Sequence, residues 1–286
     1  MVEAAGCAGS CRRCPRALRR DKLSGRPRMA KITSPAAVSI LKDIRAALDE
    51  RADEKARPAT GVKSPLKVIG VRASGVKTVA RELAVRHKAL LNYPLAADLL
   101  EGAAGRKVRE EILVAIDLLE RFRKDFEPSF LLRMDKWSSV ADDLEVAEAL
   151  GARIAAGLLA LDPSKITTVR KWARLRSVGR KRLALLAASG LVSEGRRDAM
   201  LALDLCEILL NEEHPVLVTE VAGLLRTTTK IDAKAVQDFL FRRSIDGNPA
   251  ILRAGSENLD AARRAALIAK LEAQAGIPAP VEAAEG

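Results

Sequence analysis

The sequence is poor in the residues on which much enzyme chemistry depends. Its 286 residues include two histidines, His87 and His214, four cysteines and 3% aromatic residues. A Ser-His-Asp triad, an HExxH zinc helix and a Cys/His zinc site therefore each lack members. The Gly-containing stretch GVRASG at 70–75 has neither the Walker lysine nor a following nucleotide-binding unit. We expect no cofactor, no bound metal and no nucleotide-driven reaction, and we interpret both histidines as structural or solvated.

Long apolar runs are also missing. The stretch LALLAASGLV at 183–192 is short and follows basic residues, whereas a membrane-spanning helix needs about 20 apolar residues. The N-terminus is basic and lacks the apolar segment of a secretory signal. With 48% hydrophobic residues the chain can bury a substantial core. We therefore expect a soluble cytoplasmic monomer without membrane contact.

The two ends of the chain differ in composition from the rest. We interpret 1–31 as a basic disordered leader, and Met29 as a possible true start, because structured sequence begins directly after it. Cys7, Cys11 and Cys14 cluster in the leader without a nearby fourth metal ligand, while Cys206 lies in an apolar segment, where a buried thiol is expected. The Pro-containing acidic tail 275–286 is also predicted to be disordered, which leaves 32–274 as a single domain.

That domain is predicted to be helical, because Ala, Leu, Glu, Arg and Lys dominate and apolar residues recur every three or four positions. Cap or proline signals mark helix starts at 34–35, 162–163, 193–195 and 214–215. We expect a loop at 52–73 with an extended piece near Val68–Val71, ended by a Ser74 cap. The expected helices are 35–51, 75–91, 105–123, 136–159, 164–176, 178–190, 194–211, 214–228, 232–243 and 257–274.

The short spacing of these segments predicts antiparallel neighbours, and a period near 36 to 40 residues is in the range of HEAT and armadillo repeats. The spacing alone leaves an irregular helical bundle equally open. We predict an all-α, HEAT-like or armadillo-type solenoid of antiparallel helix pairs.

Positive charge is concentrated in two places. Of the net charge of +12, the leader supplies a large part. The second concentration is 165–197, where ten Lys and Arg residues accompany a single acid, Glu194. A solvated helix face normally mixes both signs. The excess therefore favours a surface that faces a polyanion, with nucleic acid as the first choice.

One stretch, RMDKWSSVADDLEVAEALG at 133–151, could hold a reaction centre. It places Trp137, one of two tryptophans, ahead of the adjacent carboxylates Asp142 and Asp143. On one continuous helix neither carboxylate would lie over the indole, whereas Ala141 would. Helix geometry alone thus favours Trp137 as a core residue with solvated aspartates, and the active-site interpretation stays open beside it.

Several segments in order resemble the AlkD-type DNA alkylation repair glycosylases, which are built from HEAT-like repeats. The resemblance covers roughly 35–243. It rests on LKVIGVRASGVKTVARELA at 66–84, VREEILVAIDLLERF at 108–122, Trp137 with its following carboxylates, VRKWARLRSVGRKRLALL at 169–186 and VTEVAGLLRTTTKIDAKAVQDFL at 218–240.

The resemblance implies a catalytic aspartate, a cleft tryptophan and an arginine on the DNA backbone. By position the tryptophan is Trp137 and the arginine is Arg182. The aspartate falls on Ala141 when the positions are counted from the tryptophan, and on Asp143 when they are counted back from the Leu150-Gly151 end. Asp142 lies between these two positions. The family's late tryptophan falls at Gly223. We take Asp142 and Asp143 as catalytic candidates, Trp137 as the lesion cleft residue, and the following side chains as contacts to the DNA backbone: Arg182, Lys181, Arg180, Arg176 and Lys171.

The expected function is hydrolytic excision of N3- or N7-alkylated purines from double-stranded DNA, with the protein on the nucleoid when bound. Two alternatives remain. The first is a catalytically silent protein that binds distorted or branched DNA, which Ala141 and Gly223 at the family's aspartate and tryptophan positions would support. The second is a scaffold for a protein partner, which the concentration of Lys and Arg at 165–197 does not favour.

Overall fold

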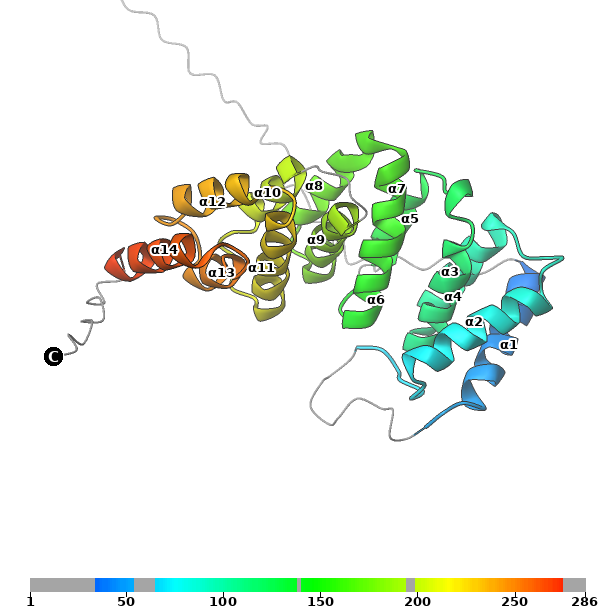
Figure 1. Cartoon of the computed structure of the whole chain (residues 1–286). Coiled ribbons are helices and arrows are strands. Elements are labelled where there is room, and N and C mark those ends of the chain that lie inside the picture. The colour runs from blue at the N-terminus through cyan, green and yellow to red at the C-terminus, as the bar shows by residue number, and fades with distance from the viewer. Residues whose placement is uncertain (1–33, 54–64, 138–139, 194–198, 275–286) are drawn as a thin grey trace, which may run out of the picture. The chain divides into compact units, whose positions relative to one another are not determined.

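A computed structural model describes residues 34–53, 65–137, 140–193 and 199–274, and most of these residues are helical (Figure 1). The first part holds α1 (Pro35–Asp49), α2 (Ala73–Arg86), α3 (Tyr93–Arg106), α4 (Arg109–Glu120), η2 (Arg123–Asp125), α5 (Phe130–Met134) and η3 (Asp135–Trp137). The second part holds α6 (Leu144–Glu148), the π-helix η4 (Ala149–Ala155), α7 (Ala156–Leu161), η5 (Pro163–Lys165), α8 (Ile166–Arg174), α9 (Val178–Ser193), α10 (Ala199–Ile208), α11 (Pro215–Thr229), α12 (Ala233–Arg242), α13 (Pro249–Gly255) and α14 (Ala261–Gln274).

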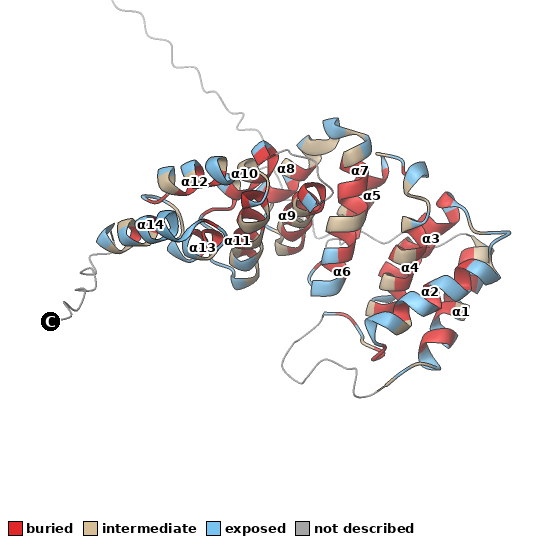
Figure 2. Cartoon of the chain, viewed as in Figure 1, coloured by how far each residue is buried: buried red, intermediate tan, exposed pale blue. Residues whose placement is uncertain are grey.

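The helices stack so that each layer contacts mainly its neighbours, as in a repeat protein. A line of helices runs along the stack: α4 packs on α6 and η4, η4 on α9, α9 on α11, and α11 on α13. The accompanying helices α2, α8, α10 and α12 pack against members of this line. Buried residues lie where neighbouring helices meet (Figure 2). The expected all-α helical solenoid is confirmed.

Most expected helices are present, and the prediction failed where periodicity was weak. Helices α3, α5 and α13 were not predicted: nine of the fourteen residues of α3 are buried, so its polar side is narrow, and α5 and α13 are only five and seven residues long. The starts at Ser34, Asp162 and Pro215 are confirmed, because Ser34 and Asp162 accept hydrogen bonds from amides of the following turn and Pro215 opens α11. The expected start at 193–195 lies largely outside the described residues, as do the leader 1–31 and the tail 275–286.

The expected Ser74 cap is wrong, because α2 begins at Ala73 and has no side-chain cap. Instead, a buried carboxylate binds the backbone of the residues that precede α2. Glu110, 2% exposed at the start of α4, accepts hydrogen bonds from the amides of Ile69, Gly70 and Val71 at 3.0, 2.9 and 3.4 Å. The extended piece is also held by a single bridge between Lys67 and Val108. No strand occurs among the described residues beyond this bridge.

The expected helix 136–159 is interrupted. The chain leaves η3 at Trp137, turns through Val140–Asp143 and starts again as α6 at Leu144. Asp143 has extended backbone angles, and its carboxylate accepts a hydrogen bond from the amide of Val146 at 3.2 Å, which is the geometry of an N-cap. Trp137 and the two aspartates therefore do not share a helix, so their angular positions on one continuous helix do not describe the structure.

Glycines permit a very close approach between η4 and α9. A Cβ added at Gly190 would lie 2.3 Å from the carbonyl oxygen of Ala152, and one at Gly151 would lie 2.5 Å from the Cβ of Leu186. Gly223, on α11, is different, because its nearest neighbour would be 3.9 Å away. The joint between η4 and α9 thus depends on the absence of side chains.

We therefore expect opposite effects from two Gly→Ala substitutions. Gly190→Ala forces backbone apart and should lower the free energy of unfolding by about 1–3 kcal/mol. Gly223→Ala has space and should be neutral or stabilising by up to about 1 kcal/mol, because alanine is the better helix former. Thermal and denaturant unfolding of both variants measures this difference, and equal stabilities would contradict the close approach.

Candidate active site

Trp137 belongs to the core beneath the turn. Its side chain is 1% exposed, and its ring meets that of Phe130 edge to face at a centroid distance of 5.4 Å. Its carbonyl oxygen accepts a hydrogen bond from the amide of Val140 at 2.9 Å, which begins the turn. Trp137 does not line the cavity described below. Its structural position matches the core interpretation, and a role in a lesion cleft would need the turn to move.

Asp143 is committed to structure. Its carboxylate is 1% exposed and forms an ion pair at 2.9 Å with Arg109 of α4, in addition to capping α6. Arg109 is itself 12% exposed. Because the carboxylate is enclosed and engaged, it is poorly placed to meet a substrate, although the sequence made it an equal candidate with its neighbour.

Asp142, in contrast to Asp143, is accessible from outside. It is exposed and lines a pocket of about 520 Å³ together with Ser177, Val178, Arg182, His214 and Val216. The pocket is formed where the turn before α6, the start of α9 and the start of α11 converge. The partial burial of Asp142 raises the pKa of its carboxyl group, and the positive charges of Arg182 and His214 oppose that rise.

Arg182 joins the turn to α11. Its side chain is 2% exposed, and it donates to the carbonyl oxygen of Ala141 at 2.8 Å and to Glu220 at 3.3 and 3.4 Å. Burial raises the pKa of Glu220, and the nearby guanidinium partly offsets this. A guanidinium has five N–H donors. All three nitrogens of the Arg182 guanidinium are engaged by protein groups, so the buried side chain serves to fix the backbone beside Asp142.

His214 was interpreted from the sequence as structural or solvated, and the structure places it in the wall of this pocket. It precedes Pro215 at the start of α11 and forms no side-chain cap. Sequence patterns could not reveal this position, because 72 residues separate His214 from Asp142 and only the stacking of helices brings them together.

The basic stretch 165–197 is less uncompensated than its sequence indicates. Acids from other segments reach it: Asp204 pairs with Arg170, Asp135 with Arg180 at 2.7 Å, Glu212 with Lys181 and Glu220 with Arg182. Among the described bases of this stretch, those that are exposed and form no ion pair with a described residue are Lys171, Arg174 and Arg176. These three keep the positive surface that the sequence predicts.

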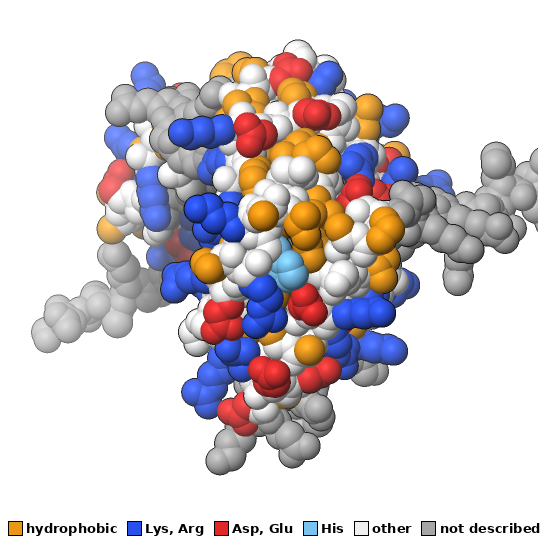
Figure 3. Space-filling view, turned by 90° about the vertical axis from the view of Figure 1, so that its right-hand side faces the viewer, with side chains coloured by type: hydrophobic (Ala, Val, Ile, Leu, Met, Phe, Trp, Pro, Cys, Tyr) orange, Lys and Arg blue, Asp and Glu red, His pale blue; other side chains and the backbone are white. Residues whose placement is uncertain are grey.

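The distribution of charge differs at the α1–α2 end. The face seen there mixes Lys and Arg with Asp and Glu side chains (Figure 3).

In the described ranges no group of three or more His, Cys, Asp and Glu residues could hold a metal ion. None of the helices within those ranges is both long and apolar enough to cross a bilayer. Cys206 is fully buried as expected, and burial raises the pKa of its thiol.

The roles of the two aspartates separate in stability measurements. Asp143→Ala removes the cap and leaves the largely enclosed Arg109 without this partner, so it should cost about 3–5 kcal/mol of unfolding free energy. Asp143→Asn keeps a capping oxygen and should cost less. Asp142→Asn should change stability by less than about 0.5 kcal/mol, because it alters an exposed side chain. Equal losses for Asp142→Asn and Asp143→Ala in denaturant unfolding would contradict this assignment.

Comparison with known proteins agrees with the fold and the order of the helices. The sequence profile described as DNA alkylation repair enzyme matches residues 44–259. Among solved structures, a predicted DNA alkylation repair enzyme from Enterococcus faecalis superimposes with a TM-score of 0.56 at 14% identity, covering 78% of this chain and 96% of that one. A search of curated proteins gives no match. Since the profile spans most of the chain, the protein belongs to the DNA alkylation repair enzyme family.

Proposed function

We propose that the protein excises N3- or N7-alkylated purines from double-stranded DNA by hydrolysis, with Asp142 as the catalytic carboxylate. The observation that supports this most is the arrangement of the turn: Asp143 is enclosed with Arg109, while Asp142 is directed into a pocket that also holds Arg182. Family membership makes alkylated DNA the natural substrate.

The chemistry needs little beyond such a carboxylate. A purine alkylated at N3 or N7 carries a positive charge, which weakens its bond to the sugar, and the transition state resembles an oxocarbenium ion. The ionised Asp142 stabilises that charge and positions the attacking water. Two charges about 4 Å apart interact by roughly 4 kcal/mol at an effective dielectric of 20, which corresponds to a rate factor near 10³. The cationic base leaves as a neutral purine with the electron pair of the broken C–N bond, and water adds its oxygen to the sugar and releases one proton to Asp142 or to bulk water.

Binding to the backbone supplies most of the affinity in this proposal. Lys171 and Arg176 are exposed and free of ion pairs with described residues, so they can neutralise phosphates directly. Arg180 and Lys181 are partly exposed and pair with Asp135 and Glu212, so a phosphate bound there would compete with these acids. Arg182 is 2% exposed, so in this proposal it holds the carbonyl group of Ala141 and thereby positions Asp142 rather than binding a phosphate itself. Recognition through phosphates and shape fits the small number of aromatic residues and requires no deep pocket for a flipped base.

A catalytically silent DNA-binding protein is the second candidate. It is favoured by one observation, the burial of Trp137, which leaves no Trp, Tyr or Phe side chain among the described residues that line the Asp142 pocket. Both candidates bind DNA, and they differ in whether base is released.

Base release distinguishes the two candidates. Duplex DNA that contains N7-methylguanine or N3-methyladenine should lose free base faster with the protein than without it. Asp142→Asn should reduce the enzymatic rate by roughly 10²–10³, because the neutral amide no longer stabilises the oxocarbenium charge. Asp238→Asn, on the exposed face of α12, makes the same change in charge and should leave the rate unaltered. DNA binding without base release by the wild type would favour the silent protein.

The contribution of the unpaired Lys and Arg side chains is measured by a salt titration of duplex binding. Removing Lys171 and Arg176 together should weaken binding and lower the slope of log K against log salt by about two, since each phosphate contact contributes about 0.9. Lys42→Ala on the exposed side of α1 should change the slope little. A slope that stays the same in the Lys171 and Arg176 variant would remove both residues from the interface.

A further inference from the structure

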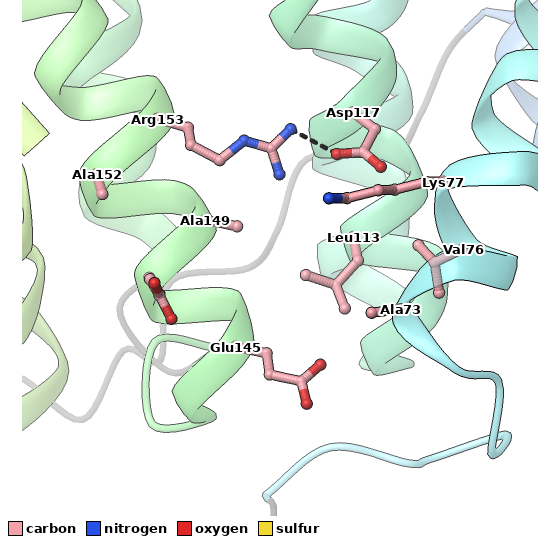
Figure 4. Close-up of a pocket in the computed structure, with 10 residues that line it drawn as sticks. Ala73, Val76, Lys77, Leu113, Asp117, Glu145, Ala149, Ala152 and Arg153 are labelled. Carbon is pink, nitrogen blue, oxygen red and sulfur yellow. Dashed lines mark hydrogen bonds and ion pairs between the residues drawn. The ribbon is translucent and has the colours of Figure 1, made fainter. Parts of the chain in front are cut away.

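A second groove lies among α2, α4, α6 and η4, and none of its residues lines the Asp142 pocket. It consists of two adjoining cavities of about 280 and 400 Å³ that share Lys77, Asp117 and Arg153. The floor of the smaller cavity is apolar and includes Val76 and Leu113. Figure 4 shows Arg153 reaching from η4 toward Asp117 on α4, with Lys77 extending from α2 into the same space.

The acids of the larger cavity are already neutralised. Arg153 pairs with Asp117 at 2.5 Å and with Glu120, to which its Nε donates at 2.8 Å. Burial opposes the charge of Arg153, but the bonds to both carboxylates outweigh this and raise its pKa. One guanidinium therefore occupies the only two acids that line this cavity.

Three bases of the same cavity remain available. Lys77 and Arg81 stand four residues apart on one face of α2, and Arg121 follows the last turn of α4. All three are exposed, and none forms an ion pair with a described residue. With Arg153 counted, four bases face two acids, so the cavity keeps an excess of positive charge.

The smaller cavity has the opposite balance. Glu145 and Glu148 of α6 join Asp117 there, against Lys77 and Arg153. Both glutamates are exposed, and Glu145 is directed into the space between α6 and α2 (Figure 4). An anion would be repelled at this end of the groove and attracted at the other, which gives the groove a direction.

We propose that the larger cavity is a second DNA-backbone site, in which Lys77, Arg81 and Arg121 bind consecutive phosphodiesters away from the Asp142 pocket. The proposal rests on the proposed function, because it takes duplex DNA as the ligand. An open groove with bases on two separate helices suits an extended backbone better than a single small anion, which would need donors that converge on one point. The glutamates of α6 keep the phosphates at the Arg81 and Arg121 end.

The test is a salt titration of duplex binding by fluorescence anisotropy with the full chain. The double substitution Arg81→Ala and Arg121→Ala should lower the slope of log K against log salt by about two. The matched control is Arg86→Ala with Lys88→Ala, which removes the same charge from exposed positions at and just beyond the end of α2 that do not line the groove. Glu145→Gln with Glu148→Gln should strengthen binding several-fold, because it removes the repulsion.

Each outcome separates this site from the Asp142 proposal. Equal slopes for the groove variant and the control, or an unchanged slope in the groove variant, would overturn the second site while base release and its dependence on Asp142 stand. A wild-type protein that does not bind duplex DNA would overturn both. Melting temperatures of all variants should match the wild type, since none of the substituted bases has an ion-pair partner in the described chain.

Discussion

The ion pair between Asp143 and Arg109 fixes the geometry on which the proposed site depends. The carboxylate of Asp143 is buried and Arg109 is 12% exposed, and the same carboxylate caps α6, so the chain turns through Val140–Asp143 before Leu144. A turn there places consecutive aspartates in opposite environments, one enclosed and one directed into a pocket. Replacing one member of a buried pair is costly because the other charge is left without compensation. The exposed aspartate is thus held in place by an enclosed neighbour, and our proposal gives the chemistry to the exposed one alone.

Arginine has a related structural role elsewhere in the stack. Arg182 ties the carbonyl oxygen of Ala141 to Glu220, and Arg153 ties Asp117 to Glu120. In each case a guanidinium binds groups outside its own helix: Arg153 of η4 pairs with two acids of α4, and Arg182 of α9 joins the turn before α6 to α11. These contacts also decide which surfaces remain positive: a base paired across the stack contributes little to an external field, while an unpaired one such as Arg121 contributes fully. The charge available to DNA is therefore set by the tertiary structure as much as by composition.

The sequence predicted the helical architecture well because amphipathic periodicity survives in most segments. It failed at α3, whose residues are buried on most sides, and at 136–159, where a single capping aspartate outweighed the helical pattern of its neighbours. The basic stretch 165–197 was recognised, but the acids that pair with it come from distant segments and could not be assigned. Asp142 and Asp143 were indistinguishable by spacing, and only Arg109, 34 residues earlier, separates them. His214 reached the site through helix stacking alone.

The central claim is that the ionised carboxylate of Asp142 is needed for cleavage of the bond between purine and sugar. Single-turnover release of N7-methylguanine, measured from acidic to neutral pH and corrected for spontaneous loss, tests it directly. Because burial raises the pKa of Asp142, the rate should fall on the acidic side with a midpoint above the ordinary value of about 3.9. That limb should disappear, together with most of the rate, in Asp142→Asn. An unchanged rate and the same acidic limb in Asp142→Asn would contradict the account.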